Sequence, residues 1–217
     1  MRLPLLRVRG LLAALSLALL SVACGERERP PVPFSAASQT TSPFASTDIT
    51  GAPWGRDFHL LDAAGTPRTL ADYRGKAVML FFGYTHCPDM CPTALAQMAA
   101  VRAKLGAKGD RVQGLFVTVD PKRDTPEVLA RYAPGFDPSF VGLYADEQTT
   151  AALAKDFKVY FAAQKPDAGG NYTVDHNGGI YVFDPAGRLR LMMRSDLGVA
   201  AMAADVARLL QEETPKS

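Results

Sequence analysis

The chain has 217 residues, of which 47% are hydrophobic and 21% are charged. This composition is typical of a globular protein, so it excludes a chain that is disordered throughout, a collagen-like fibre and a disulfide-dense miniprotein. The formal charge is +2, but Arg2, Arg7 and Arg9 lie in a short N-terminal segment; without them 21 basic side chains oppose 22 acidic ones, a balance of −1. A near-neutral body lacks the positive charge that binding to nucleic acid or adsorption to a membrane surface requires.

The N-terminal segment has the pattern of a signal peptide. Its three arginines precede an uncharged run, residues 11–23, and Cys24 follows that run. As a helix the run would span about 20 Å, whereas the hydrocarbon core of a membrane is roughly 30 Å thick. We therefore predict a signal peptide over residues 1–23 and an exported protein.

Cys24 allows two interpretations. The sequence Ser21-Val22-Ala23-Cys24 resembles the end of a bacterial lipoprotein leader, in which the cysteine becomes the lipidated first residue of the mature protein. Small residues at positions 21 and 23 also fit ordinary cleavage of a signal peptide. We favour lipidation, which would anchor the protein to a membrane, and in either case Cys24 is separate from the site of the folded body.

A tether and one domain follow the leader. Residues 24–50 are rich in Pro, Ser and Thr and contain almost no aliphatic side chains, a composition that cannot bury enough surface to fold. We predict a flexible tether over residues 24–50 and a single domain over residues 51–213. The domain has no internal repeat of the length found in solenoids or propellers.

The domain sequence alternates between strands and helices. A continuous apolar run at residues 77–82 predicts a strand buried on both faces, and residues 112–119 predict a second buried strand. Apolar spacing and capping residues predict four helices, at residues 95–105, 125–132, 146–157 and 199–210.

A hairpin is expected near the C-terminus. Two apolar runs, residues 180–183 and 189–193, flank the turn sequence Asp-Pro-Ala-Gly at residues 184–187. The order of elements predicts an α/β protein with a thioredoxin-like fold, in which a mixed central sheet has helices on both faces.

Two cysteines, Cys87 and Cys91, follow the first predicted strand, at the sheet edge where sites form in open α/β folds. With Pro88 at the first helical position, Cys87 would lie at the positive end of a helix, which favours a thiolate. Residues four apart on a helix have Cβ atoms about 5–6 Å apart, but a disulfide needs about 3.5–4.5 Å. The spacing therefore favours a shared metal ion over metal-free redox chemistry or a structural disulfide, and it excludes neither.

A third ligand would come from one of the three histidines. His59 lies among apolar residues and is expected to be a strand histidine, while His86 has only its proximity to Cys87 in its favour. His176 lies in a polar, glycine-bearing loop where a side chain is easily presented, although an exposed loop histidine without a function is the simpler interpretation of the residues alone. Two thiolates and one imidazole suit copper, Cu(I) above all, because structural zinc requires a fourth ligand.

Further polar residues follow the second predicted strand at the same sheet edge. Asp120, Arg123 and Asp124 either line the site, guide a partner or cap a proline-containing turn, and the sequence does not separate these roles. Three methionines are expected to fill the core rather than to bind metal: Met90, Met192 and Met193.

Three segments together resemble the SCO/SenC family of thioredoxin-fold copper proteins: FFGYTHCPDMCP, VTVDPKRDTPEVLARY and YTVDHNGGIYVFDPAGRL. The similarity covers essentially all of residues 51–213, with the three motifs in the same order. The resemblance implies that Cys87, Cys91 and His176 bind one copper ion per chain, as Cu(I) or Cu(II), and it alone makes His176 the expected third ligand.

The same resemblance implies a copper metallochaperone that assists maturation of the binuclear copper centre in a subunit of cytochrome c oxidase. Other copper chaperones would be further partners, and the site of action would be the bacterial periplasm or the outer face of a membrane. The alternative is a thiol:disulfide oxidoreductase in which Cys87 attacks and Cys91 resolves, and a peroxide-reducing enzyme is a third hypothesis. Dedicated oxidoreductases generally have two residues between their cysteines, whereas this chain has three, so a non-enzymatic role is favoured.

Overall fold

The computed structural model describes residues 42–212. The predicted signal peptide, Cys24 and the first part of the predicted tether, residues 24–41, lie outside the described residues. The strands are β1 (Thr47–Asp48), β2 (Leu60–Asp62), β3 (Pro67–Arg68), β4 (Ala77–Gly83), β5 (Val112–Thr118), β6 (Val141–Tyr144), β7 (Phe161–Ala163), β8 (Val174–His176), β9 (Ile180–Phe183) and β10 (Leu189–Met193). The α-helices are α1 (Met90–Lys104), α2 (Pro126–Tyr132), α3 (Glu147–Asp156) and α4 (Val199–Glu212), and short 3-10 helices cover Leu70–Tyr73, Gly106–Arg111 and Ser195–Leu197.

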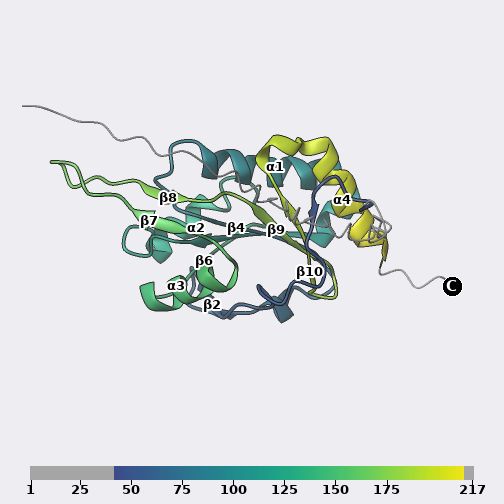
Figure 1. Ribbon diagram of the computed structural model, residues 1–217, viewed down its shortest axis with the longest axis horizontal. Coiled ribbons are helices and arrows are strands. Elements are labelled where there is room, and N and C mark those ends of the chain that lie inside the picture. The colour runs from purple at the N-terminus through teal and green to yellow at the C-terminus, as the bar shows by residue number, and fades with distance from the viewer. Residues whose placement is uncertain (1–41, 213–217) are drawn as a thin grey trace, which may run out of the picture. The chain divides into compact units, whose positions relative to one another are not determined.

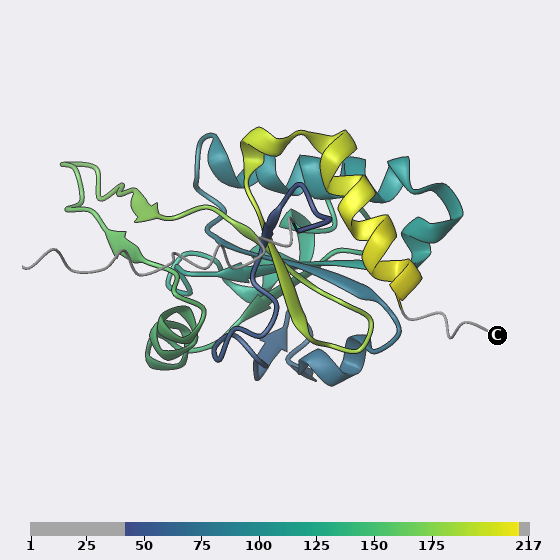
Figure 2. The ribbon, with the colours of Figure 1, turned by 45° about the vertical axis from the view of Figure 1, so that its right-hand side comes forward.

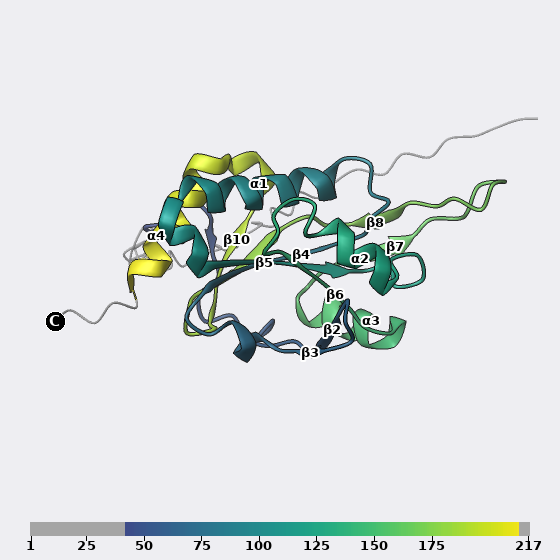
Figure 3. The ribbon, with the colours of Figure 1, turned by 180° about the vertical axis from the view of Figure 1, so that it is seen from behind.

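Eight of the strands form one mixed sheet in the order β1-β10-β9-β4-β5-β6-β2-β3 (Figure 1). The central strands β4 and β5 run parallel and are buried along their whole length, as their apolar sequences predict, while β9 runs antiparallel to β4. Helices α1 and α4 cover one face of the sheet and α3 lies on the other side (Figure 3). The predicted mixed sheet with helices on both faces and the hairpin β9–β10 are therefore confirmed.

Strands β7 and β8 form a separate two-stranded ribbon. The chain between them extends away from the main sheet as a long arm (Figure 2). This ribbon is important for the site because its second strand, β8, ends at His176.

The first helix begins two residues later than Pro88, so the prediction of Pro88 at the first helical position is wrong. Asp89 is the N-cap of α1, and its carbonyl oxygen accepts the amide of Thr93 at 3.1 Å. Cys87 instead lies in the preceding turn, where its amide donates to the carbonyl oxygen of Tyr84 at 3.2 Å. The two cysteines therefore lie on a turn and on the first helical turn, rather than on one continuous helix.

The folded domain begins before residue 51, so the tether prediction does not hold for residues 42–50. In this segment Phe44 and Ser46 are buried, and β1 pairs with β10 at the edge of the main sheet. The buried carboxylate of Asp205 on α4 accepts three hydrogen bonds, from the amides of Ala45 and Ser46 and from the Ser46 hydroxyl. Composition did not reveal this because the partner lies about 160 positions away in the sequence.

Candidate metal centre

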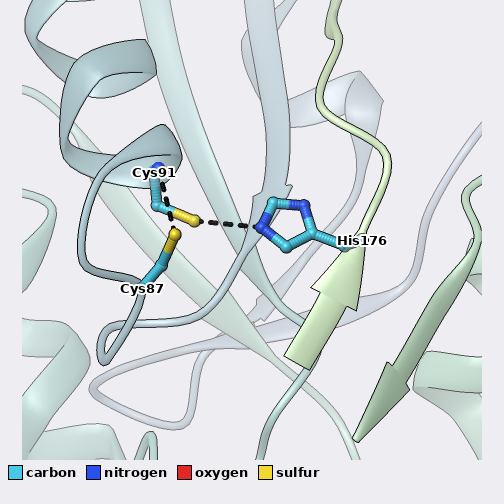
Figure 4. A group of neighbouring side chains, drawn as sticks. All are labelled: Cys87, Cys91 and His176. Carbon is cyan, nitrogen blue, oxygen red and sulfur yellow. Dashed lines mark hydrogen bonds between the residues drawn. The ribbon is translucent and has the colours of Figure 1, made fainter. Parts of the chain in front are cut away.

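The side chains of Cys87, Cys91 and His176 converge at the end of β4 (Figure 4). Cys87 comes from the turn after β4, Cys91 from the first turn of α1 and His176 from the end of β8. Their potential ligand atoms all lie within 4.8 Å of one another. The structure thus brings together the three residues predicted as metal ligands, although 85 positions separate Cys91 from His176.

The sulfur of Cys87 faces the N-terminus of α1. The amide of Cys91 donates to the Sγ atom of Cys87 at 3.4 Å. This amide is one of the first in the helix, which have no partner within the helix, so the sulfur takes the place of a capping oxygen. The positive end of the helix dipole therefore faces Cys87, as predicted, although Cys87 itself precedes the helix.

Cys91 is fully buried beside Gly83. Burial raises the pKa of the Cys91 thiol, the neighbouring Cys87 raises it further, and only the amide of Tyr84 acts in the opposite direction. A Cβ atom at position 83 would lie 2.7 Å from the Cys91 sulfur, so a glycine is required for this close approach. In the metal-free protein Cys91 is therefore a neutral thiol, and metal binding has to displace its proton.

His176 presents Nε2 to the Cys91 sulfur at 3.3 Å. The rings of Phe81 and Tyr84 contact the imidazole edge-on, with centroid distances of 6.0 and 5.8 Å. Burial lowers the pKa of His176, against smaller opposing effects of a hydrogen bond with the Asn177 backbone and of the Asp175 charge. The imidazole is therefore neutral near pH 7, which is the form that binds metals.

The three donors fit a soft metal ion. With metal–sulfur bonds of about 2.3 Å and metal–nitrogen bonds of about 2.0 Å, the donors of a three-coordinate site are separated by roughly 4 Å. The observed separations, all within 4.8 Å, require only small side-chain movements. The Nδ1 atom of His176 is buried and has no hydrogen-bond partner within residues 42–212, so Nε2 is the nitrogen that faces the other donors. Two sulfurs and one imidazole match the ligand preference of Cu(I).

The other candidate residues lie outside this group. His59 is exposed just before β2, and His86 is exposed with its Nδ1 atom 3.8 Å from the Asp124 carboxylate. Among the methionines, Met193 is in the core as predicted, but Met90 is 42% exposed, so the core-filling interpretation is wrong for it. Met90 is the first residue of α1 and its side chain points outward, whereas the next residue, Cys91, is buried.

The surroundings of the imidazole were not predicted from the sequence. Phe81, Gly83 and Tyr84 all occur in the FFGYTHCPDMCP segment, so their proximity to the cysteines was visible. The contacts of Phe81 and Tyr84 with His176 could not be seen in the sequence, because these contacts depend on where β8 lies relative to β4.

Comparison with known proteins places these motifs in a family. The family model described as SCO1/SenC matches residues 45–211. A curated relative, the mitochondrial SCO2 homolog of Mus musculus, is 43% identical over 133 residues, which are 60% of this chain and 52% of that protein. The chain spans about half the length of such mammalian relatives.

Solved structures resemble the domain over nearly their whole length. Copper-bound ScoI from Bradyrhizobium japonicum is 37% identical with a TM-score of 0.64, over 70% of this chain and 97% of that one. Copper-bound yeast Sco1 is 31% identical with a TM-score of 0.66, over 74% of this chain and 90% of that one. These similarities confirm the thioredoxin-like fold that the order of elements predicted.

Proposed function

The chain belongs to the SCO1/SenC family, and on that basis we propose that it is a copper metallochaperone. It binds one copper ion per chain, as Cu(I) or Cu(II), through the thiolates of Cys87 and Cys91 and the imidazole of His176. It assists maturation of the binuclear copper centre in a subunit of cytochrome c oxidase, with other copper chaperones as further partners. The convergence of the three donors carries this proposal, and the copper bound in two relatives supports it.

The arrangement suits an ion that is delivered rather than kept. Three protein donors leave a coordination position for a ligand from a partner, so that exchange does not require the protein to unfold. Cys87 is partly exposed whereas Cys91 is fully buried, so an incoming partner meets the site on the Cys87 side. Copper supplies the soft Lewis acid, and the protein supplies two sulfurs and one neutral imidazole, with the buried Cys91 thiol losing its proton on binding.

A titration of reduced protein with Cu(I) in the absence of oxygen tests this function. We expect one ion per chain, and His176→Ala should weaken binding by more than about tenfold, the lower bound for losing even an outer-shell partner. His59→Ala is the matched control, because that histidine is exposed and lies outside the group. A stoichiometry well below one, or equal affinities for the two variants, would refute the ligand assignment.

The thiol:disulfide oxidoreductase hypothesis is the second candidate, and the two free cysteines favour it. The more exposed Cys87 would attack a disulfide of an exported protein and Cys91 would resolve the mixed disulfide, so the two thiols become a disulfide and the substrate gains two electrons. The raised pKa of Cys91 slows the resolving step. Steady turnover of a disulfide substrate by metal-free protein, with a thiol reductant present, would favour this enzyme over the chaperone.

We also infer that the protein is exported to the periplasm or the outer face of a membrane and is held there by a lipid on Cys24. The inference rests on the leader sequence, which lies outside the described residues. No helix within residues 42–212 is long and apolar enough to cross a membrane. Mass spectrometry of the mature N-terminus tests it: a lipidated Cys24 supports the anchor, and an unmodified cleaved terminus contradicts it.

A further inference from the structure

The loop between β5 and α2, residues 119–125, contacts both segments that carry the three donors. On the histidine side, β7 and β8 pair only with each other among the described residues. No hydrogen-bond ladder of the main sheet therefore fixes the position of His176. Contacts of other kinds do so: Tyr84 has a hydrogen bond with the backbone of Val174 in β8, and two of the loop residues, Asp120 and Arg123, provide further contacts.

Asp120 and Arg123 together hold Tyr172, which lies two residues before β8. The Tyr172 hydroxyl donates to the Asp120 carboxylate at 2.8 Å, and Nη1 of Arg123 donates to the Tyr172 carbonyl oxygen at 2.7 Å. The guanidinium carbon also lies 3.5 Å from the centroid of the Tyr172 ring, a cation–π distance. Tyr172 is thus held through its hydroxyl, its ring and its backbone.

The two loop residues are themselves paired and largely shielded from water. Nε of Arg123 lies 2.5 Å from the Asp120 carboxylate, and their side chains are 20% and 5% exposed. Charges that are shielded in this way are screened less by salt than surface pairs. The Asp120–Arg123 pair is therefore a shielded ion pair that can fix the position of the ribbon, rather than a solvated surface contact.

Arg123 also reaches the cysteine side. Its guanidinium carbon lies 5.7 Å from the centroid of the Tyr84 ring, and that ring contacts the imidazole of His176. The carbonyl oxygen of Tyr84 in turn accepts the amide of Cys87. One guanidinium group thus contacts a tyrosine from each of the two ligand-bearing segments.

The next residue, Asp124, holds the cysteine turn to the same loop. Its buried carboxylate accepts the Thr85 amide at 3.0 Å, the Thr85 hydroxyl at 2.6 Å and the Thr118 hydroxyl at 2.6 Å. Thr85 lies two residues before Cys87, and Thr118 ends β5. A single loop therefore fixes the cysteine turn through Asp124 and the histidine ribbon through Asp120 and Arg123.

We propose that Asp120 and Arg123 are positioning residues: through their contacts with Tyr172 they keep the imidazole of His176 close to the cysteine sulfurs. When these contacts with Tyr172 are removed, the ribbon is free to move and His176 separates from the two cysteines. The cysteine turn stays in position because Asp124 still binds Thr85. The proposal deepens the proposed function, and it rests on that function only where copper affinity is the measurement.

The first test needs no metal. Nuclear Overhauser cross-peaks between the His176 ring and the rings of Phe81 and Tyr84 report the position of the imidazole. We expect them in the parent protein and expect them to weaken in Tyr172→Phe, which removes only the hydroxyl, and in Arg123→Lys, which removes the planar fork but keeps the charge. Unchanged cross-peaks in both variants would overturn the proposal.

Two matched controls accompany this test. Tyr160→Phe removes a phenol hydroxyl from a 65% exposed ring at the base of the same ribbon. Arg68→Lys makes the same change, removing the planar guanidinium and keeping the charge, in a pair with Asp62 at the β2–β3 edge of the sheet. Both should retain the cross-peaks of the parent, and a loss as large as in the test variants would overturn the specific role of Arg123 and Tyr172.

The second test is a double-mutant cycle with His176→Ala, using Cu(I) affinity measured against a competing chelator. We expect Tyr172→Phe and Arg123→Lys each to lower the affinity by about tenfold when His176 is present, as for other supports of metal ligands. In the His176→Ala background they should have no further effect. Equal losses in both backgrounds would overturn the proposal. If the parent binds no copper, the proposed function fails, and the cross-peaks still decide the role of Arg123.

Discussion

The Nε2 atom of His176 lies 3.3 Å from the Sγ atom of Cys91, and burial shifts the pKa of both groups. Burial raises the pKa of the Cys91 thiol and lowers the pKa of the His176 imidazole. Each shift disfavours the charged form, as expected where desolvation dominates. A metal ion entering this site therefore competes with a proton on the thiol but not with a proton on the imidazole.

Copper affinity should rise with pH. Because the pKa of Cys91 is above its ordinary value, the thiol stays protonated between pH 6 and pH 8, and each ion bound releases at least its proton. The apparent affinity for Cu(I) should therefore increase by about tenfold or more per pH unit in this range. Competition titrations at pH 6, 7 and 8 measure the slope.

The histidine should add little to this slope. The lowered pKa of His176 keeps the imidazole neutral at pH 7 and above, so His176→Ala should reduce the affinity at pH 7 and at pH 8 by a similar factor. An affinity that does not change with pH would show that Cys91 is already a thiolate in the metal-free protein.

Gly83→Ala should damage both the fold and the site. The added Cβ atom would lie 2.7 Å from the Cys91 sulfur and 2.9 Å from ring carbons of Phe81 and Phe116. Overpacking of this kind costs about 1–3 kcal/mol, and here it also displaces a sulfur of the proposed metal site. Urea unfolding should show the loss of stability, and chelator competition should show a loss of Cu(I) affinity of about tenfold or more.

Gly114→Ala on the neighbouring strand is the control for this substitution. Its Cβ atom would overlap the buried ring of Phe140, far from the donors, so it should lower stability without lowering the copper affinity of the folded protein. If both variants bind copper as well as the parent does, the contact between Gly83 and Cys91 is not needed to place the sulfur.

The central fold could be predicted because its signals are local. Strands β4 and β5 are each seven residues long and mostly apolar, and the turn between β9 and β10 carries its own sequence signal. Strands β1, β7 and β8 have two or three residues each, too few for a periodic pattern. They are held by residues elsewhere in the chain: Asp205 binds the segment just before β1, and Asp120 and Arg123 bind Tyr172 in the ribbon segment.

The site could be predicted only in part. The spacing of Cys87 and Cys91 favoured a metal ion shared by the two sulfurs, but only a family resemblance indicated that His176 is the third ligand. Its position depends on a ribbon held by Arg123, which lies more than fifty positions earlier in the sequence. The start of α1 was also misplaced, because a proline after Cys87 fits both a first helical position and a turn.

Asp205→Asn should release the N-terminal segment of the domain. One carboxylate oxygen accepts both donors of Ser46 and the other accepts the Ala45 amide, and an amide side chain can replace only one of these acceptors. Leaving buried donors unpaired costs about 1–3 kcal/mol. Urea unfolding should show this loss, and limited proteolysis should cut within residues 42–50 before it cuts the rest of the domain.

Two serine variants separate this contact from a general effect of substitution in the segment. Ser46→Ala removes one buried hydroxyl bond to Asp205 and should cost about 1 kcal/mol. Ser42→Ala removes an exposed bond to Asp48 and a 3.3 Å bond from the Phe44 amide, and because Ser42 is exposed it should cost less than Ser46→Ala, about 0.5 kcal/mol. Equal losses for the two serines would contradict a special role for Asp205.

Gly178→Ala should have a small effect that depends on Met90. The backbone at position 178 does not have a positive φ, so glycine is not required there for its conformation. A Cβ atom would, however, overlap the sulfur of Met90, which is 42% exposed and free to rotate into water. We expect Gly178→Ala to cost about 0.5 kcal/mol or less in urea unfolding, well below the cost of Gly83→Ala.

The dependence on Met90 is the sharper part of this prediction. In a Met90→Ala background, Gly178→Ala should cost nothing, because the overlapping sulfur is gone and the two substitutions are coupled. Met98→Ala on the inward face of the same helix should cost about 2–5 kcal/mol whichever residue occupies position 178. If Gly178→Ala costs the same with either side chain at position 90, the overlap with Met90 is not the reason for a glycine two residues after His176.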